Sequence, residues 1–359
     1  METDFIVIGG GIAGVSVGAR LSHLGRVTLF EAEKALGCHA SGRSAALFDE
    51  CLGAPEIVTL NRAGRAYHET ANGGVLTPRD LMVIARAEDR AAFERDCRHM
   101  ALAQISPAEA RARVPILAPG PLAFAGLTDR AWDIDTDRLL QNFAREIRAQ
   151  GSRIETGRRV TAIARVATGW QVRTGDDIAE GRILVNAAGA WADEIARLAG
   201  LTPLGLTPMR RSMAQLPAPA GHDIRTWPMV IGAGERWYCK PEAGKLLVSP
   251  AEEDPMPPHD AYADDMVLAE GLDRYQEMVT EPVTRVEANW AGLRTFAPDR
   301  LLVIGPDPRD QDFFWHAGQG GFGIQTSPAA SELAADILGD RASELRRSLA
   351  PAFSPARFG

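Results

Sequence analysis

Three glycines near the start of the chain, followed by one acidic residue, have the spacing of a motif that binds a nucleotide. Gly9, Gly11 and Gly14 follow an apolar run as G-x-G-x-x-G, and Glu31 ends a second apolar run. The first glycine permits a tight turn, the second lets the backbone approach a pyrophosphate, and the third lets a helix pack closely on the strand. A carboxylate at position 31 can accept hydrogen bonds from both ribose hydroxyls, which favours FAD or NAD over NADP. The motif therefore predicts a dinucleotide site.

The motif lies in a predicted strand–helix–strand unit. Residues 5–8 and 27–30 are short apolar runs that predict buried strands, and a helix with regularly spaced Ala and Leu begins near Ile12. The first N–H groups of that helix, at Ile12 and Ala13, have no partners within the helix and can face the phosphates. A unit of this kind whose glycine turn binds nothing has the same pattern, so the motif alone leaves that alternative open.

A loop of small residues follows Glu31, and its position predicts contact with the ligand. Residues 34–53 include Ser41, Arg43 and Ser44. The loop leaves the carboxyl end of a predicted strand, where α/β sheets bind their ligands. The two serines can bond phosphate or ribose oxygens, and the arginine can offset the charge of a pyrophosphate. A plain surface loop is the alternative.

Pieces of the same fold recur in the middle and at the end of the chain. Residues 183–186 predict a buried strand that runs into Ala188 and Gly189. Residues 313–317 predict another strand, which ends in the glycine-rich segment 318–323 before a helix over about 326–338. Small residues at these points allow close approach of either a neighbouring helix or the dinucleotide.

Residues 203–290 have a different pattern, with more Pro and Trp and several short alternating strands. This pattern predicts the antiparallel sheet of a second domain. The fold class we expect is therefore α/β, with a Rossmann-like domain assembled from discontinuous segments and an α+β second domain on a mixed or antiparallel sheet.

The composition excludes several classes of protein. The chain has 359 residues, 45% of them apolar, and a net charge of −8, which disfavours nucleic acid and anionic membranes as partners. The four cysteines show no CxxC and no metal-ligand spacing, so we expect no metal site and a reducing, cytoplasmic location. No signal peptide is evident, and no run of eighteen apolar residues predicts a membrane span.

Six segments carry a resemblance to a known family. In chain order they are GRSAA (42–46), IDTD (134–137), VNAAGAW (185–191), RRS (210–212), WAGLR (290–294) and GQGGFGIQTS (318–327). Together they resemble the D-amino acid oxidase–type FAD-dependent oxidoreductases, a family that includes glycine oxidase. The resemblance is strongest to the bacterial D-arginine dehydrogenase–like enzymes. The resemblance implies an FAD-binding domain made of residues 1–80, 145–205 and 295–359. It implies a substrate-binding domain made of residues 81–144 and 206–294.

The resemblance also implies which residues bind FAD. The last glycine segment would lie by the pyrimidine edge of the flavin, where the positive end of the following helix can stabilise an anionic reduced ring. The flavin should be bound non-covalently, because some relatives attach it to a late Cys and this chain has none beyond Cys239. The implied cofactor-binding residues are Gly9, Gly11, Ile12, Ala13, Gly14, Glu31, Ser41, Gly42, Arg43, Ser44, Ala46, Val160, Ala188, Gly189, Trp191, Arg294, Gly320, Gly321, Phe322, Gly323, Ile324 and Gln325.

In this family a hydride moves from the substrate α-carbon to flavin N5, and the protein positions the substrate. Arg211 and Arg294 match arginines that clamp an amino acid carboxylate, and Tyr238 matches a tyrosine that helps to hold it. A packed aromatic side chain is the alternative for Tyr238. Arg210 should face outward, because neighbouring strand residues point to opposite faces.

The predicted side-chain pocket is apolar. Met229 and Ile231 match apolar contacts, for which core packing is the alternative, and Gly321 lies beside them. In the D-arginine dehydrogenase pattern a His, a Tyr and a Glu occupy positions where this chain has Leu47, Leu52 and Leu81. A guanidinium buried against leucines would cost several kcal/mol or so. We therefore expect substrates with neutral or apolar side chains, unless Asp49 or Glu50 supplies the missing carboxylate.

The sequence leaves three other functions open. They are oxidation of a secondary amine or N-alkyl amino acid, oxidation of a 2-hydroxy acid, and service as the flavin-binding subunit of a complex. A 2-hydroxy acid needs a base, typically His, and only His39 and His316 lie near the predicted flavin segments. The sequence does not identify the electron acceptor, which could be oxygen or a quinone, or the oligomeric state.

Overall fold

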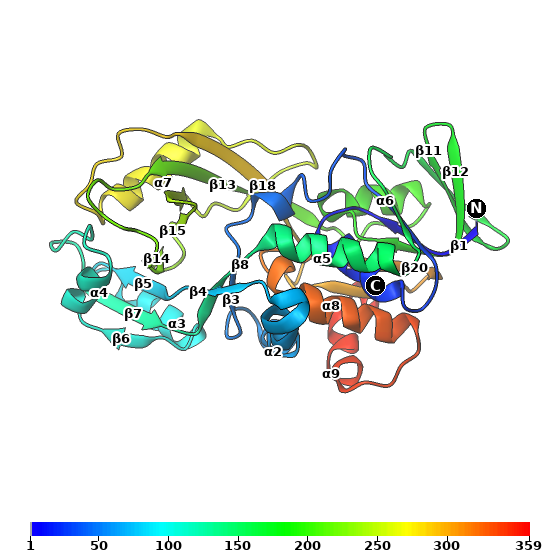
Figure 1. Cartoon of the computed structure of the whole chain (residues 1–359), viewed down its shortest axis with the longest axis horizontal. Helices are drawn as coiled ribbons and strands as arrows, with labels where there is room; N and C mark the ends of the chain where they lie inside the picture. The colour runs from blue at the N-terminus through cyan, green and yellow to red at the C-terminus, as the bar shows by residue number, and fades with distance from the viewer. Residues whose placement is uncertain (1) are drawn as a thin grey trace.

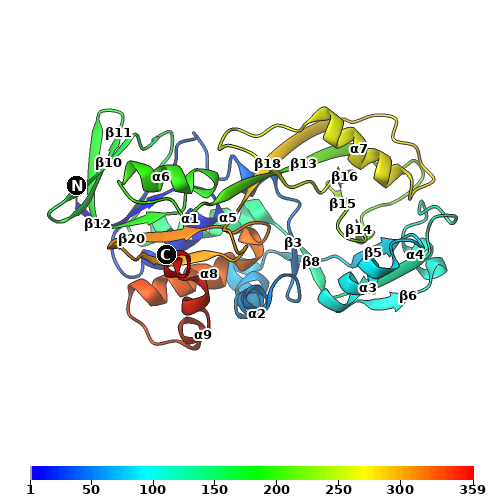
Figure 2. The same ribbon diagram turned by 180° about the vertical axis from the view of Figure 1, so that it is seen from behind.

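Two large sheets lie side by side along the long axis of the molecule, with a small sheet between them (Figure 1). The structure, a computed structural model, describes residues 2–359. The chain begins in one sheet, crosses to the other and returns twice, so that its two ends lie in the same half (Figure 2). Among the described residues, no helix is long and apolar enough to cross a membrane.

The first sheet has eight strands around a parallel core. Its central order is β20-β12-β1-β2-β9, all parallel, with β19 antiparallel to β20 and the β10–β11 hairpin paired to the first half of β12. The strands are β1 (Glu2–Ile8), β2 (Val27–Phe30), β9 (Arg153–Glu155), β10 (Ala162–Val166), β11 (Gly169–Thr174), β12 (Asp177–Asn186), β19 (Val303–Asp307) and β20 (Asp310–Ala317).

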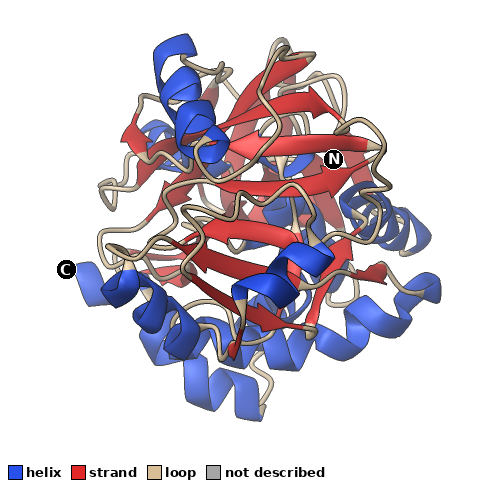
Figure 3. Ribbon diagram, turned by 90° about the vertical axis from the view of Figure 1, so that its left-hand side faces the viewer, coloured by secondary structure: helices blue, strands red, loops and turns tan. Residues whose placement is uncertain are grey.

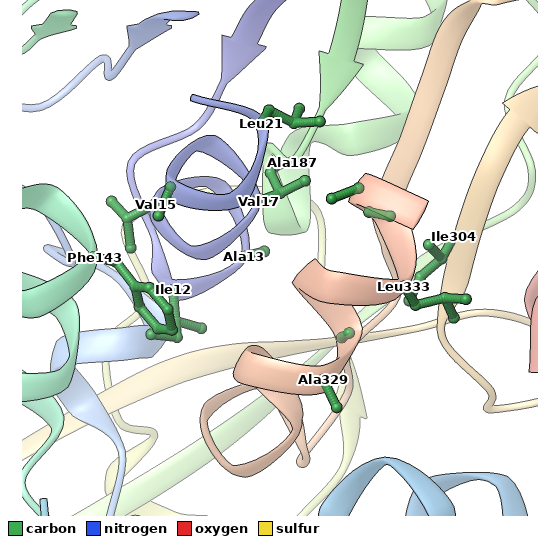
Figure 4. Close-up of a cluster of buried hydrophobic side chains, with 14 of the residues drawn as sticks. Ile12, Ala13, Val15, Val17, Leu21, Phe143, Ala187, Ile304, Ala329 and Leu333 are labelled. Carbon is green, nitrogen blue, oxygen red and sulfur yellow. The ribbon is translucent and has the colours of Figure 1, made fainter. Parts of the chain in front are cut away.

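Alternate residues of β1 pack on opposite faces of this sheet, as strand geometry requires. Phe5 and Val7 contact a cluster built by α1 (Ile12–Leu21), α5 (Thr136–Ala149) and α8 (Gly323–Leu338). Figure 4 shows Ile12, Val17 and Leu333 within this cluster. Ile6 and Ile8 pack on the other face with Trp170 and α6 (Ala192–Leu198). Burial on both faces explains why β1 is a continuous apolar run.

The second sheet has nine strands and is mixed rather than purely antiparallel. Its order is β17-β13-β16-β15-β14-β5-β7-β6, with β18 beside β13, and only the β5–β14 pair is parallel. The strands are β5 (Leu81–Ala85), β6 (Ala103–Ile105), β7 (Phe124–Thr128), β13 (Thr207–Pro217), β14 (Met229–Gly232), β15 (Tyr238–Glu242), β16 (Lys245–Ser249), β17 (Asp254–Pro255) and β18 (Ala288–Phe296). Residues 81–128 therefore add three strands that their sequence did not predict.

Helices flank the strands of the molecule on its outside (Figure 3), and a small third sheet completes the fold. The small sheet has the order β3-β8-β4. Its strands are β3 (Leu47–Asp49), β4 (Leu76–Pro78) and β8 (Ala131–Ile134); the other helices are α2 (Pro55–Thr70), α3 (Arg90–His99), α4 (Pro107–Arg113), α7 (Asp265–Gln276) and α9 (Glu344–Phe353), with the short 3-10 helices η1 (Ala40–Arg43), η2 (Ala71–Gly73), η3 (Gly189–Trp191) and η4 (Pro355–Phe358).

Helix starts follow the capping residues in the sequence. The Asp135 side chain accepts a hydrogen bond from the Arg138 N–H and so caps the start of α5. The helix after the last glycine segment begins at Gly323, three residues earlier than expected. The predicted limits of the two domains stay a prediction, although each large sheet takes its strands from the segments proposed for one domain.

Candidate functional site

A long groove crosses the carboxyl ends of β1, β2 and β12 and continues between the two large sheets to β13, β15 and β18. It brings together most of the residues predicted from the sequence. The predicted residues that line it are Gly9, Gly11, Ile12, Ala13, Glu31, Ser41, Arg43, Ser44, Val160, Ala188, Gly189, Trp191, Arg211, Tyr238, Arg294, Gly320, Gly321, Gly323 and Ile324.

The first glycine turn has the geometry that a pyrophosphate needs. Gly9 has φ +113°, which favours glycine, and a Cβ at Gly14 would lie only 1.8 Å from the Gly9 carbonyl oxygen. Gly14 therefore lies outside the groove and lets α1 pack on the turn. A Cβ at Gly11 would meet only the Ser41 hydroxyl, so this backbone is open to the groove. The fit supports a dinucleotide.

The Glu31 carboxylate is held at the edge of the groove by two backbone donors. Its Oε2 accepts from the Gly10 N–H at 2.5 Å, and its Oε1 accepts from the Glu33 N–H at 2.7 Å. Each carboxylate oxygen has a second lone pair that can accept from a ribose hydroxyl. The geometry is compatible with the predicted contact to an unphosphorylated ribose.

The loop after Glu31 supports the groove rather than simply lining it. The Ser41 hydroxyl accepts from the Ile12 N–H at 2.9 Å, and Gly42 donates to the Gly37 carbonyl at 2.8 Å. Arg43 Nη1 donates to the carbonyls of Ala261 and Ala291, and its Nη2 pairs with Asp260. These contacts occupy the guanidinium predicted to offset a pyrophosphate charge.

The two candidate carboxylate clamps have different surroundings. Arg294 lies against Gly321, where a Cβ would be 3.2 Å from Nη1, and it makes no ion pair or side-chain hydrogen bond with residues 2–359. Arg211 pairs with Glu235 at 3.0 Å and Glu253 at 3.2 Å. Burial lowers the pKa of Arg294, and the Arg211 charge lowers it further. Of the two arginines, only Arg294 therefore faces the groove without a carboxylate partner among residues 2–359.

Tyr238 lies beside these arginines. It is 3% exposed, lines the groove, and has the Arg211 guanidinium 6.0 Å from its ring centroid. Burial would lower the pKa of Arg211, but Tyr238 and the two glutamates raise it overall. Arg211 is thus charged but already neutralised by the protein.

Five residues predicted for the side-chain pocket do not line the groove and lie instead in a buried apolar cluster, which reaches the groove through Met213 and Tyr238. They are Leu47, Leu52, Leu81, Met229 and Ile231. Leu81, Met229, Ile231 and Tyr238 are buried in this cluster, and Leu47 and Leu52 pack against it. Leu81 is paired with Met229 across β5 and β14. Of the carboxylates proposed as substitutes, Glu50 pairs with Arg65 at 3.0 Å. Asp49 is fully buried, and burial raises the pKa of its carboxyl group.

The last glycine segment closes the groove at the start of α8. Gly320 donates to the Thr295 carbonyl at 2.8 Å, and a Cβ there would lie 2.4 Å from the Phe296 ring. Gly321, Gly323 and Ile324 line the groove. Four other predicted cofactor residues (Gly42, Ala46, Phe322 and Gln325) do not line it.

Two expectations are wrong. Arg210 does point to the face opposite Arg211 but is only 7% exposed, because it pairs with Asp254 of the neighbouring strand β17 at 2.7 Å and also lies near Glu252 and Asp264. His68 also lies near the flavin segments, with its Nε2 2.8 Å from the Gln325 carbonyl. Contact between α2 and α8 joins residues far apart in sequence and leaves no local signal.

Other groove residues were not among the predicted site residues. Met213 faces the groove two residues after Arg211 on the same strand, so period-2 alternation could have identified it. His39 lines the groove with its ring 4.8 Å from that of Trp191. Gly10, Arg158 and Arg159 also line it. His316 is 1% exposed, and burial lowers its pKa to about 4.

Comparisons with known proteins agree with this geometry. A family model described as DAO, FAD dependent oxidoreductase, matches residues 4–337. The chain is 23% identical to FAD-dependent oxidoreductase domain-containing protein 1 of Mus musculus, over 94% of this chain and 81% of that protein. It is 27% identical to the tRNA 5-methylaminomethyl-2-thiouridine biosynthesis bifunctional protein MnmC of Burkholderia multivorans, over 98% of this chain but only 59% of that protein.

The fold also matches a solved enzyme over its full length. Glycine oxidase from Geobacillus kaustophilus superposes with a TM-score of 0.84 over 99% of both chains, at 23% identity.

Proposed function

Because the chain belongs to the DAO family of FAD-dependent oxidoreductases, we propose that it oxidises the α-carbon of a D-amino acid with a neutral or apolar side chain. The product would be an imino acid, which water hydrolyses to a 2-oxo acid and ammonia. In this family FAD accepts the hydride, and the groove described above has the donors and the open glycine backbone to hold it. The D configuration rests on the sequence segments that resemble D-amino acid dehydrogenases.

The observation that carries the proposal is the unpaired Arg294 guanidinium. A cation that faces a groove without a partner among residues 2–359 needs an anion from the ligand. A carboxylate can take two parallel N–H···O bonds from it, which fixes the orientation of the substrate as well as its position. Tyr238, beside the clamp, adds a hydroxyl donor.

The apolar cluster supports the choice of side chain. Leu47, Leu52 and Leu81 belong to the apolar cluster that reaches the groove through Met213 and Tyr238, and the two carboxylates that could have replaced an acidic pocket residue are occupied or buried. A cationic side chain directed into this cluster would lose its hydration without gaining a partner. An apolar side chain would gain about 25 cal/mol per Å² of buried surface.

A steady-state kinetic screen of D-amino acids with different side chains tests this proposal. We expect kcat/KM for D-leucine, D-methionine and D-phenylalanine to exceed that for D-arginine and D-lysine by at least about tenfold, which is about 1.4 kcal/mol. Faster turnover of D-arginine than of D-leucine would contradict it. The matched variant Leu81→Gln should narrow the preference, because it places a polar group in the apolar cluster.

An N-alkyl amino acid is the second candidate, because its carboxylate would use the same unpaired Arg294. Sarcosine and N-methyl-D-leucine in the same screen separate the two candidates. The same screen covers 2-hydroxy acids. Their oxidation is less well supported, because His39 is engaged by Glu33 at 3.3 Å and His316 is buried away from the groove.

A further inference from the structure

A loop of the second sheet covers the groove where the FAD would lie. Residues 256–263, which we call the strap, connect β17 to α7, and the strap residues His259 and Ala261 line the groove. In Figure 1 the yellow loop that leads into α7 extends toward α6, over the middle of the molecule. We propose that the strap closes over bound FAD and retains it, and that Arg43 and Asp260 are the positioning residues that latch it.

The latch joins the two halves of the molecule. Arg43 belongs to η1, in the loop that follows the nucleotide-binding strands, and η1 packs against β18. Its Nη1 donates to the strap carbonyl of Ala261 at 2.8 Å and to the Ala291 carbonyl of β18 at 2.9 Å. Its Nη2 lies 2.5 Å from Asp260, and this pairing lowers the pKa of the Asp260 carboxyl group. One guanidinium thus ties η1, the strap and β18 together.

Few other contacts hold the strap. At the start of the strap, the Met256 N–H donates to the Pro208 carbonyl at 3.0 Å; beyond it, within the part of the chain that the structure describes, no backbone N–H of residues 259–263 donates to another backbone group, and residues 257 and 258 are prolines. Ala261 and Met256 pack with Ala190, Leu293 and Trp191 in a small apolar cluster at the groove. A segment that is backbone-paired only at one end can open while the rest of the sheet stays intact. The latch therefore accounts for much of what keeps the strap closed.

Removal of the Asp260 carboxylate distinguishes two possible roles of Arg43. If Arg43 acted as a charge on the pyrophosphate, the nearby Asp260 carboxylate would oppose FAD binding, and its removal would tighten the complex. If Arg43 acts as the latch, removal of Asp260 loosens the strap and speeds the release of FAD. A lysine at position 43 would keep the charge but lose the planar fork that reaches two carbonyls and a carboxylate at once.

The test is the dissociation rate of FAD from the holoenzyme, followed by the fluorescence of the released flavin after dilution. We expect Arg43→Lys and Asp260→Asn each to release FAD about three- to tenfold faster than the unaltered protein, and the double variant to be no faster than the quicker single variant. Asp265→Asn is the matched control, because Asp265 is exposed and lies just beyond the strap. Its release rate should be unchanged.

Chymotrypsin provides a readout independent of flavin fluorescence. Tyr262 in the strap is 68% exposed, but cleavage requires the surrounding strap to open. Cleavage after Tyr262 in the holoenzyme should be faster in both single variants than in the control. The proposal is overturned if Asp260→Asn slows or does not change FAD release, or if Arg43→Lys matches the unaltered protein. Neither result depends on which substrate is oxidised.

Discussion

Replacement of Arg294 by Met is the most informative single change, because this guanidinium has no partner among residues 2–359. A hydrogen bond to a charged group contributes about 1.5–3 kcal/mol, so a bidentate carboxylate pair is worth about 3 kcal/mol or more. At 1.4 kcal/mol per factor of ten, Arg294→Met should lower carboxylate affinity and kcat/KM by about 100-fold or more. Arg211→Met should cost less, because Arg211 already shares its charge with Glu235 and Glu253.

The assay is a titration of the holoenzyme with benzoate, a carboxylate that cannot be oxidised, followed by the perturbation of the flavin absorbance. Thermal unfolding is the control. Arg294→Met should not lower the melting temperature, since it removes a half-buried cation that has no carboxylate partner among residues 2–359 and is repelled by Arg211. Benzoate affinity within threefold of the unaltered protein would refute the assignment of Arg294 as the anion receptor.

Four further results are expected. Glu235→Gln removes one of the two carboxylates that pair with Arg211, so benzoate should bind several-fold tighter, and weaker binding would contradict this. Burial lowers the pKa of His68 and His316 to about 4, and their unfolded value is near 6.5. The unfolded chain therefore binds more protons between these values, and stability should fall as pH drops from 6.5 to 4, by on the order of 3 kcal/mol per histidine, in urea titrations that His68→Gln makes less steep. Gly14→Val should abolish FAD binding, measured as flavin content, because its Cβ would overlap the Gly9 carbonyl oxygen. Acid precipitation should leave the flavin in the supernatant; flavin in the pellet would show covalent attachment.

Some parts of the site were predictable because each depends on a short stretch of sequence. The glycine spacing, Glu31 and the last glycine segment each report a turn and the strand before it, and the groove brings them together. Arg211 and Arg294 were identified by resemblance alone. Their different states were not, because Glu235 and Glu253 come from two loops whose approach to Arg211 depends on the folded sheet.

The missed parts depend on contacts between distant segments. The strand β5 lies in the middle of a sheet and pairs with β14, which comes nearly 150 residues later in the chain. The segment that follows β5 in the sequence is charged and forms the helix α3, so the local sequence did not indicate a central strand. The alternation of residues along β13 predicts that Arg210 is exposed, but Asp254 of the neighbouring strand β17 pairs with it. The pairing of Arg43 with Asp260 was missed for the same reason, since nothing in the sequence relates Asp260 to the loop of residues 34–53 that contains Arg43.

The central claim is that this groove places the α-carbon of a D-amino acid against the flavin, and anaerobic reduction of the bound flavin tests it most directly. Mixing the holoenzyme with D-leucine under nitrogen should bleach the visible flavin band. L-leucine, sarcosine and D-lactate should bleach it far more slowly or not at all. Rapid bleaching by D-lactate or L-leucine, with D-leucine inert, would contradict the account.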